Sequence, residues 1–175
     1  RHVISESENV DITLDDGTKV GGEVIYADDR HDVAVVGFSG KKAPVTTGLA
    51  LAPGAVDDLD SVVATGYPFL AGKPSFQISK GEVRNRSFER DFDGDLKETY
   101  IQHSASIDPG SSGGPLLDAK NQVVGINTGF LPEKHDVFLA LPQKVVGDAV
   151  DKAITIEEMR SVPEWRTAGI YKACK

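Results

Sequence analysis

Cysteine is nearly absent from this chain of 175 residues, since it occurs once, at Cys174. A single cysteine excludes an internal disulfide and a cysteine-based zinc cluster, so the fold depends on packing. Basic residues are also few: 19 Lys and Arg stand against 27 Asp and Glu, which gives a net charge of −8. Nucleic-acid binding needs an excess of positive charge to neutralise phosphates, so we expect no nucleic acid among the partners.

The chain also lacks a long apolar segment. The longest compact run extends from Val33 to Phe38, far short of the roughly 20 residues that a membrane-spanning helix needs. We therefore expect no membrane insertion. Glycine and proline are plentiful, with 18 and 9 residues, and they separate short runs of β-branched or alternating residues. This pattern predicts many strands joined by turns.

The expected strands follow directly from these runs. They lie at 10–14, 19–26, 32–38, 61–66, 75–85, 99–104, 115–117, 123–128 and 137–141. One stretch, from Pro142 to about Ala153, favours a helix, because proline suits the first turn and apolar residues recur at a spacing of three to four. The sequence therefore predicts an all-β protein with one helix near the end of the chain.

A glycine-rich segment at 108–117 contains the strongest candidate for a reactive group, Ser112. Glycines on both sides of a serine let the backbone turn tightly and direct successive N–H groups into a small concavity. Such a concavity would bind an oxyanion while the serine hydroxyl faces a carbonyl carbon. Taken alone, the same pattern also fits an ordinary glycine-rich turn between two strands.

A serine hydroxyl needs a base to act as a nucleophile, and the chain has four histidines. His103 lies in an expected strand and His135 in a polar loop, where a solvated role suits both. His31 adjoins Asp32, and adjacent strand residues point to opposite faces, so the two cannot easily serve one site. His2 remains as a candidate, although residues so close to a terminus often fray.

Three segments stand in a characteristic order: RHVI at 1–4, DDRHDVAVV at 28–36 and PGSSGGPL at 109–116. Together they resemble the signature segments of the HtrA/Deg branch of the chymotrypsin-fold serine proteases. The resemblance implies a catalytic triad of His2, Asp32 and Ser112. This chain order is that of chymotrypsin and differs from that of subtilisin.

Further segments extend the resemblance over most of the chain. They are GYPF at 66–69, KGEV at 80–83, GIN at 125–127 and FLALP at 138–142. The implied fold is an all-β, chymotrypsin-like double β-barrel with a C-terminal helix. The implied divisions are a partial N-terminal barrel at 1–55, a C-terminal barrel at 56–142, a helix at 143–160 and a tail or linker at 161–175.

The sequence departs from the family at its two ends. The family has about two strands before its catalytic histidine, whereas one residue precedes His2 here. We therefore expect an incomplete first barrel in this chain, and upstream residues in the functional molecule. Residues 1–175 do not include the family's PDZ module, but WRTAGI at 165–170 resembles the segment that often leads into one, so we expect truncation at this end as well.

The resemblance implies a serine endopeptidase in which Ser112 forms an acyl-enzyme. Backbone N–H groups of Gly110 and Ser112 would form the oxyanion hole, with Ser111 as a further candidate. The residues expected to wall the specificity pocket are Ser106, Ile107, Asn127, Thr128 and Ala140. Ser106 stands where trypsin-type enzymes carry an acid, so we expect a small or medium apolar residue before the scissile bond. Ser106 and Asn127 also suit purely structural roles.

The expected substrate is unfolded or extended polypeptide, bound by β-augmentation against the strand after Gly125. No cofactor and no metal are required. The alternative is a catalytically impaired, protease-like module that binds peptides, because a truncated first barrel holds His2 less tightly. A homo-oligomer would also fit the family, and the resemblance favours a periplasmic, extracellular or organellar compartment.

Overall fold

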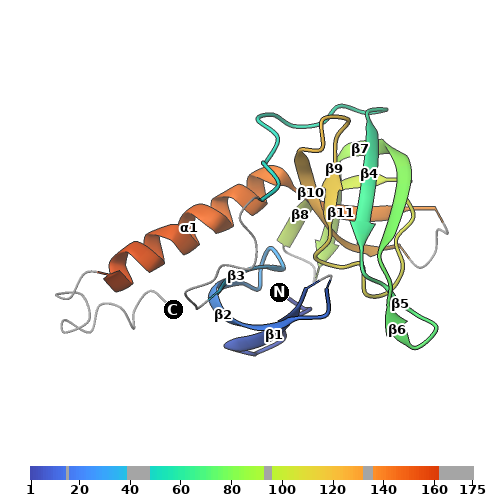
Figure 1. Cartoon of the computed structure of the whole chain (residues 1–175). Helices are drawn as coiled ribbons and strands as arrows, with labels where there is room; N and C mark the ends of the chain where they lie inside the picture. The colour runs from blue at the N-terminus through green and yellow to red at the C-terminus, as the bar shows by residue number, and fades with distance from the viewer. Residues whose placement is uncertain (15, 39–47, 93–95, 132–135, 162–175) are drawn as a thin grey trace. The chain divides into compact units, whose positions relative to one another are not determined.

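The computed structural model describes residues 1–14, 16–38, 48–92, 96–131 and 136–161 (Figure 1). Its contacts divide the chain into two units. The first takes residues 1–47 together with the chain from Gly147 onward, and the second takes residues 48–146.

The first unit contains a three-stranded antiparallel sheet in the order β1-β2-β3. Strand β1 (Asn9–Thr13) pairs with β2 (Lys19–Asp28), and β2 pairs with β3 (Val33–Phe38). These are the strands that the described residues of this unit form, and they make an open sheet instead of a closed barrel. The expectation of an incomplete first barrel is therefore confirmed.

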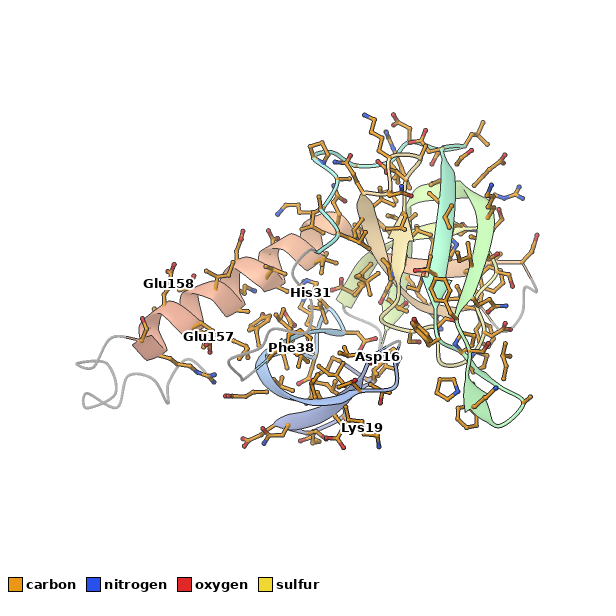
Figure 2. The ribbon with its side chains drawn as sticks, in the orientation of Figure 1. Asp16, Lys19, His31, Phe38, Glu157 and Glu158 are labelled. Carbon is orange, nitrogen blue, oxygen red and sulfur yellow. The ribbon has the colours of Figure 1, made fainter. Side chains whose placement is uncertain are left out.

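Local turn chemistry explains the hairpin between β1 and β2. The Asp16 Oδ1 atom accepts the backbone N–H of Thr18 at 2.8 Å, and Gly17 has a φ of +82°. Glycine adopts this left-handed conformation without a steric penalty. Figure 2 labels Asp16 and Lys19 on either side of this turn.

The second unit is a closed barrel with the strand order β10-β11-β8-β7-β4-β9 (Figure 1). Its strands are β4 (Ser61–Gly66), β7 (Gln77–Phe92), β8 (Leu96–His103), β9 (Pro115–Leu117), β10 (Val123–Phe130) and β11 (Phe138–Pro142). A short hairpin of β5 (Phe69–Leu70) and β6 (Lys73–Pro74) follows β4 and projects from the barrel (Figure 1).

The core of the barrel consists of small and branched apolar side chains. It comprises Val56, Val62, Ala64, Val83, Ile101, Ala105, Ile107, Leu116, Val124, Phe138 and Ala140. The segment before Val56 also belongs to this unit: Leu51 forms a bridge with Val123, and the Ala52 N–H donates to the Val123 carbonyl at 2.9 Å. The barrel is therefore closed and filled independently of the sheet in the first unit.

Helix α1 runs over Gln143–Ser161 and ends well beyond Ala153, where the apolar spacing stops. Its last turns contain good helix formers and an ion pair between Arg160 and Glu157 at 2.7 Å. Arg160 also pairs with Glu23 of β2 at 2.7 Å, which ties the end of the helix to the sheet of the first unit. Within the described residues, α1 is too polar to cross a membrane.

Candidate active site

In the first unit, His2 and Asp32 form a close pair. The His2 Nδ1 atom lies 2.5 Å from Asp32 Oδ2, and the His2 backbone N–H donates to Asp32 Oδ1 at 2.7 Å. Burial raises the pKa of Asp32, but the two hydrogen bonds from His2 outweigh it and hold the pKa below its ordinary value. A charged carboxylate on Nδ1 leaves the other ring nitrogen, Nε2, able to act as a base.

Asp32 lies at the end of a turn that leads from β2 into β3, and its backbone has a φ of +52°. A residue with a side chain pays a penalty in this left-handed region, so the surrounding contacts must hold it there. The conformation lets one carboxylate bind both the backbone and the ring of His2.

In the second unit, Ser112 lies in a loop that needs glycine at several of its positions. Gly110 and Gly113 have φ angles of +100° and +89°. A Cβ atom on Gly114 would lie 2.1 Å from the carbonyl oxygen of Thr65, well inside any allowed contact. The glycines thus allow the loop to pass close to β4.

Some backbone N–H groups of this loop already donate a hydrogen bond within the protein, and others do not. The N–H of Ser111 donates to the Asp108 carbonyl at 2.9 Å, and that of Gly113 donates to the Asn127 carbonyl at 2.8 Å. Among the described residues, the N–H groups of Gly110 and Ser112 make no hydrogen bond. These two donors are therefore available to an oxyanion, whereas that of Ser111 is not.

The Ser112 hydroxyl itself donates to the carbonyl oxygen of Thr128 on β10 at 2.9 Å. A nucleophilic attack would require the hydroxyl to leave this acceptor for a base. Thr128 therefore contacts the serine through its backbone.

Beside the serine loop lies a cavity of about 270 Å³, lined by Thr65, Gly66, Tyr67, Phe76 and residues 110–115. The rings of Tyr67 and Phe76 meet with their centres 5.2 Å apart, and about half of each side chain is exposed. We did not anticipate this aromatic wall from the sequence, although Tyr67 belongs to the GYPF segment that extends the resemblance. The signal available in the sequence was the group of aromatic residues in and shortly after this segment, Tyr67, Phe69 and Phe76.

The residues expected to wall a specificity pocket divide into two groups. Ser106 is exposed and Thr128 is partly buried, so substrate could reach both. Ile107, Asn127 and Ala140 are buried, and Ile107 and Ala140 belong to the barrel core. The Asn127 amide donates to the carbonyls of Thr65 and Pro115 at 3.3 and 3.4 Å. This pair of bonds gives Asn127 a structural role between strands.

The other histidines have separate surroundings. His31 pairs with Asp28 at 3.0 Å, and Figure 2 labels it in the first unit. His103 is fully buried in the second unit, 6.0 Å from the ring of Phe138, so the solvated role expected for it is wrong. His135 and the segment 165–170 lie outside the described residues. The part of the chain that the structure describes contains no group of three potential metal ligands.

Comparison with known proteins agrees with this geometry. Residues 1–126 match the family described as the trypsin-like peptidase domain. A probable periplasmic serine endoprotease, DegP-like, of Chlamydia trachomatis is 30% identical over 161 residues, which is 88% of this chain and 30% of that protein. Its counterpart from Brucella suis is 33% identical over 156 residues, 87% of this chain and 29% of that protein. The chain thus spans about a third of the length of these relatives.

Solved structures show the same relationship. The HtrA-type protease AlgW with a decapeptide superposes with a TM-score of 0.71 at 25% identity, covering 88% of this chain and 46% of that one. The protease Rv3671c of M. tuberculosis in its inactive form gives 0.71 at 25% identity, covering 87% and 76%.

The chain belongs to the trypsin-like peptidase family. Within that family its relatives are serine proteases of the HtrA and DegP type, so the resemblance stated from the motifs is confirmed. The all-β, chymotrypsin-like fold with one helix is confirmed as well.

Proposed function

We propose that this chain is a serine endopeptidase with His2 as its base, Asp32 as the partner of that base and Ser112 as its nucleophile. The observation that carries the proposal is the 2.5 Å hydrogen bond between His2 Nδ1 and Asp32. The serine loop supports it, because the loop leaves two N–H donors unused beside the hydroxyl. The names of the relatives support the same reaction class.

The proposed reaction follows the acyl-enzyme route. The Ser112 Oγ atom leaves the Thr128 carbonyl and bonds to the peptide carbonyl carbon, while its proton passes to Nε2 of His2. The N–H groups of Gly110 and Ser112 stabilise the oxyanion. The carbon–nitrogen bond then breaks, and His2 returns the proton to the leaving amine. Water attacks the ester with His2 again as base, which releases the acid and restores the serine.

The proposed substrate is unfolded polypeptide with apolar side chains near the scissile bond. The cavity beside Ser112 has a wall of two half-exposed aromatic rings, Tyr67 and Phe76. Phe69 is also exposed, by 66%, on the adjacent hairpin. Folded proteins bury most of their large apolar side chains, so a surface of this kind selects chains that expose them.

Covalent labelling tests the proposed nucleophile. We expect a fluorophosphonate probe to modify the wild-type chain at one serine and to leave Ser112→Ala unlabelled, because only an activated hydroxyl attacks the probe. Ser111→Ala is the matched control: it removes the neighbouring hydroxyl and should label like the wild type. Peptide mapping by mass spectrometry identifies the site. A folded wild type that binds unfolded polypeptide but takes no label at Ser112 would support the binding module instead.

Removing the aromatic wall should weaken substrate binding. We expect Tyr67→Ala and Phe76→Ala each to raise KM for an apolar unfolded substrate by roughly three- to tenfold, since each loses up to about 1.5 kcal/mol of apolar contact. The rings lie beside the reacting group without taking part, so kcat should change little. Phe38→Ala, which removes an exposed aromatic of the first unit, is the control. Unchanged KM in both cavity variants would contradict the proposed binding role.

A further inference from the structure

A second carboxylate, Asp28, lies at the end of β2, four residues before Asp32 in the chain. Among the described residues, the hydrogen bonds of Asp28 go to Tyr26, Arg30 and His31 instead of His2, and Asp28 takes no part in the proposed reaction. Asp28 is partly buried and makes several hydrogen bonds. What these contacts stabilise is the turn that presents Asp32.

Both oxygens of Asp28 accept hydrogen bonds. The Oδ1 atom accepts the backbone N–H of Arg30 at 3.0 Å and that of His31 at 3.3 Å. The Oδ2 atom accepts the Tyr26 hydroxyl at 3.0 Å and lies 3.0 Å from His31 Nδ1. A short polar side chain that caps the backbone two and three residues ahead is the usual way to stabilise a tight turn.

The charge state of Asp28 agrees with these contacts. Burial raises the pKa of Asp28, but the hydrogen bonds from the His31 ring and the Tyr26 hydroxyl outweigh it and lower the pKa to about 2. The carboxylate is therefore charged at neutral pH, and hydrogen bonds to a charged acceptor are the stronger kind. Helix α1 also reaches this cluster: Lys152 Nζ donates to the Tyr26 hydroxyl at 3.0 Å, and Asp148 lies near Lys152 on the same helix.

The capped turn ends at the strained residue of the site. Asp32 places its carboxylate on His2 from a backbone with a φ of +52°, a conformation that surrounding contacts must hold in place. The same turn also binds the residue before His2, because Arg1 Nε donates to Asp29 Oδ1 at 2.6 Å. The turn thus positions both members of the His2–Asp32 pair.

We propose that Asp28 is a positioning residue: by capping the 28–32 turn it holds Asp32 in the conformation that keeps His2 Nδ1 hydrogen-bonded. The inference rests on the proposed function for its effect on catalysis. Its effect on the His2–Asp32 hydrogen bond is independent of that function. Asp28 neither touches the reacting atoms nor transfers a proton.

The test compares Asp28→Ala with Asp28→Asn in the full chain. Asparagine retains an acceptor for the two backbone N–H groups, whereas alanine removes the cap. Asp118→Ala is the matched control, because Asp118 Oδ1 caps another turn through the N–H groups of Lys120 and Gln122, both at 2.8 Å. That turn lies in the second unit, so its loss tests the effect of removing any turn cap.

The first readout is the proton on His2 Nδ1, followed by NMR at low temperature. A proton shared with a carboxylate at 2.5 Å should resonate far downfield. Asp32→Asn and His2→Gln should each remove the signal, which assigns it to the His2–Asp32 pair. We expect Asp28→Ala to abolish or strongly weaken this signal, and Asp28→Asn and Asp118→Ala to retain it.

The second readout is steady-state hydrolysis of an unfolded substrate. We expect Asp28→Ala to lower kcat by roughly 10- to 100-fold with KM within about twofold, because a misplaced base affects the transition state more than binding. Asp28→Asn should remain within about threefold of the wild type. A purely structural role would lower the stability of Asp28→Ala and Asp118→Ala alike and would leave the kcat of the folded fraction unchanged.

The two proposals fail in different ways. A folded Asp28→Ala chain that retains the downfield proton would overturn the positioning role, whatever the activity. So would an Asp28→Asn chain that loses the proton although its turn cap remains. A third outcome is a wild-type chain that hydrolyses no substrate while Asp28→Ala still abolishes the downfield proton. That result would support the positioning role and overturn the proposed endopeptidase activity.

Discussion

Ser112→Ala is expected to lower kcat for hydrolysis of an unfolded polypeptide by roughly 10⁴- to 10⁶-fold. Alanine removes the atom that forms the acyl-enzyme but leaves the backbone N–H groups of Gly110 and Ser112 in place. Within the part of the chain that the structure describes, the Ser112 hydroxyl makes one hydrogen bond, to Thr128, so its removal should alter the fold little. Initial rates on a casein-like substrate, with stability measured in parallel, check the prediction.

Non-additivity gives a sharper form of the same prediction. Residues that act as one catalytic unit lose little more when a second member is removed. We therefore expect Asp32→Ala in the Ser112→Ala background to cause no further loss of turnover. Ser87→Ala, an exposed serine of β7, is the matched control and should retain full activity. A Ser112→Ala chain that hydrolyses the substrate within tenfold of the wild type would rule out this serine as the nucleophile.

The second large effect concerns stability, and it originates at His103. Burial lowers the pKa of this side chain from 6.5 to about 4. Among the described residues neither ring nitrogen makes a hydrogen bond of normal geometry, and a weaker contact with the Ala105 backbone raises the pKa without offsetting the burial. The ring lies beside Phe138 in the second unit. A proton on this ring would place a charge in the barrel core without a counter-ion.

The direction in which stability changes with pH follows from the state that binds the proton. Between pH 6.5 and about pH 4 the unfolded chain holds a proton on His103 that the folded chain lacks. The contribution of His103 is therefore complete above pH 6.5 and is lost as the pH falls toward 4. The pKa difference corresponds to roughly 3 kcal/mol in the free energy of unfolding.

Denaturant unfolding at pH 7, 6, 5 and 4 measures this contribution. Asp28 and Asp32 also bind protons more readily when the chain unfolds, so the wild type must be compared with variants that retain both carboxylates. His103→Leu and His103→Gln both remove the titrating ring, one with an apolar and one with a polar side chain. Between pH 7 and pH 4, we expect the free energy of unfolding of each variant to fall by about 3 kcal/mol less than that of the wild type. Parallel curves for all three chains would show that His103 is not the acid-sensitive group.

Much of the site could be inferred from the sequence because its residues lie in short motifs. The segments around His2, Asp32 and Ser112 carry both the reactive side chains and the glycines that shape the loop. The strand pattern succeeded for a similar reason, since β-branched runs and turn residues act locally. The triad roles stay predictions, although the hydrogen bond between His2 and Asp32 supports two of them.

The rest depended on contacts between distant segments. Tyr67 and Phe76 are nine residues apart in sequence, and the pairing of β4 with β7 brings their rings together. Burial of Asn127 could not be read from its polar side chain, because it follows from carbonyl acceptors on Thr65 and Pro115. The apolar spacing ends near Ala153 and misses the last turns of the helix, where Arg160 makes ion pairs with Glu157 and Glu23; the division at 143–160 came from the family resemblance.

The position of Gly114 bears on what a motif search detects. A side chain there would overlap the Thr65 carbonyl, so the glycine is required by the path of the backbone whether or not Ser112 reacts. A relative that had exchanged the serine for another small residue would still need this glycine to fold. The glycines in such a motif are therefore a marker of the fold, and the hydroxyl between them is the part that carries information about the chemistry.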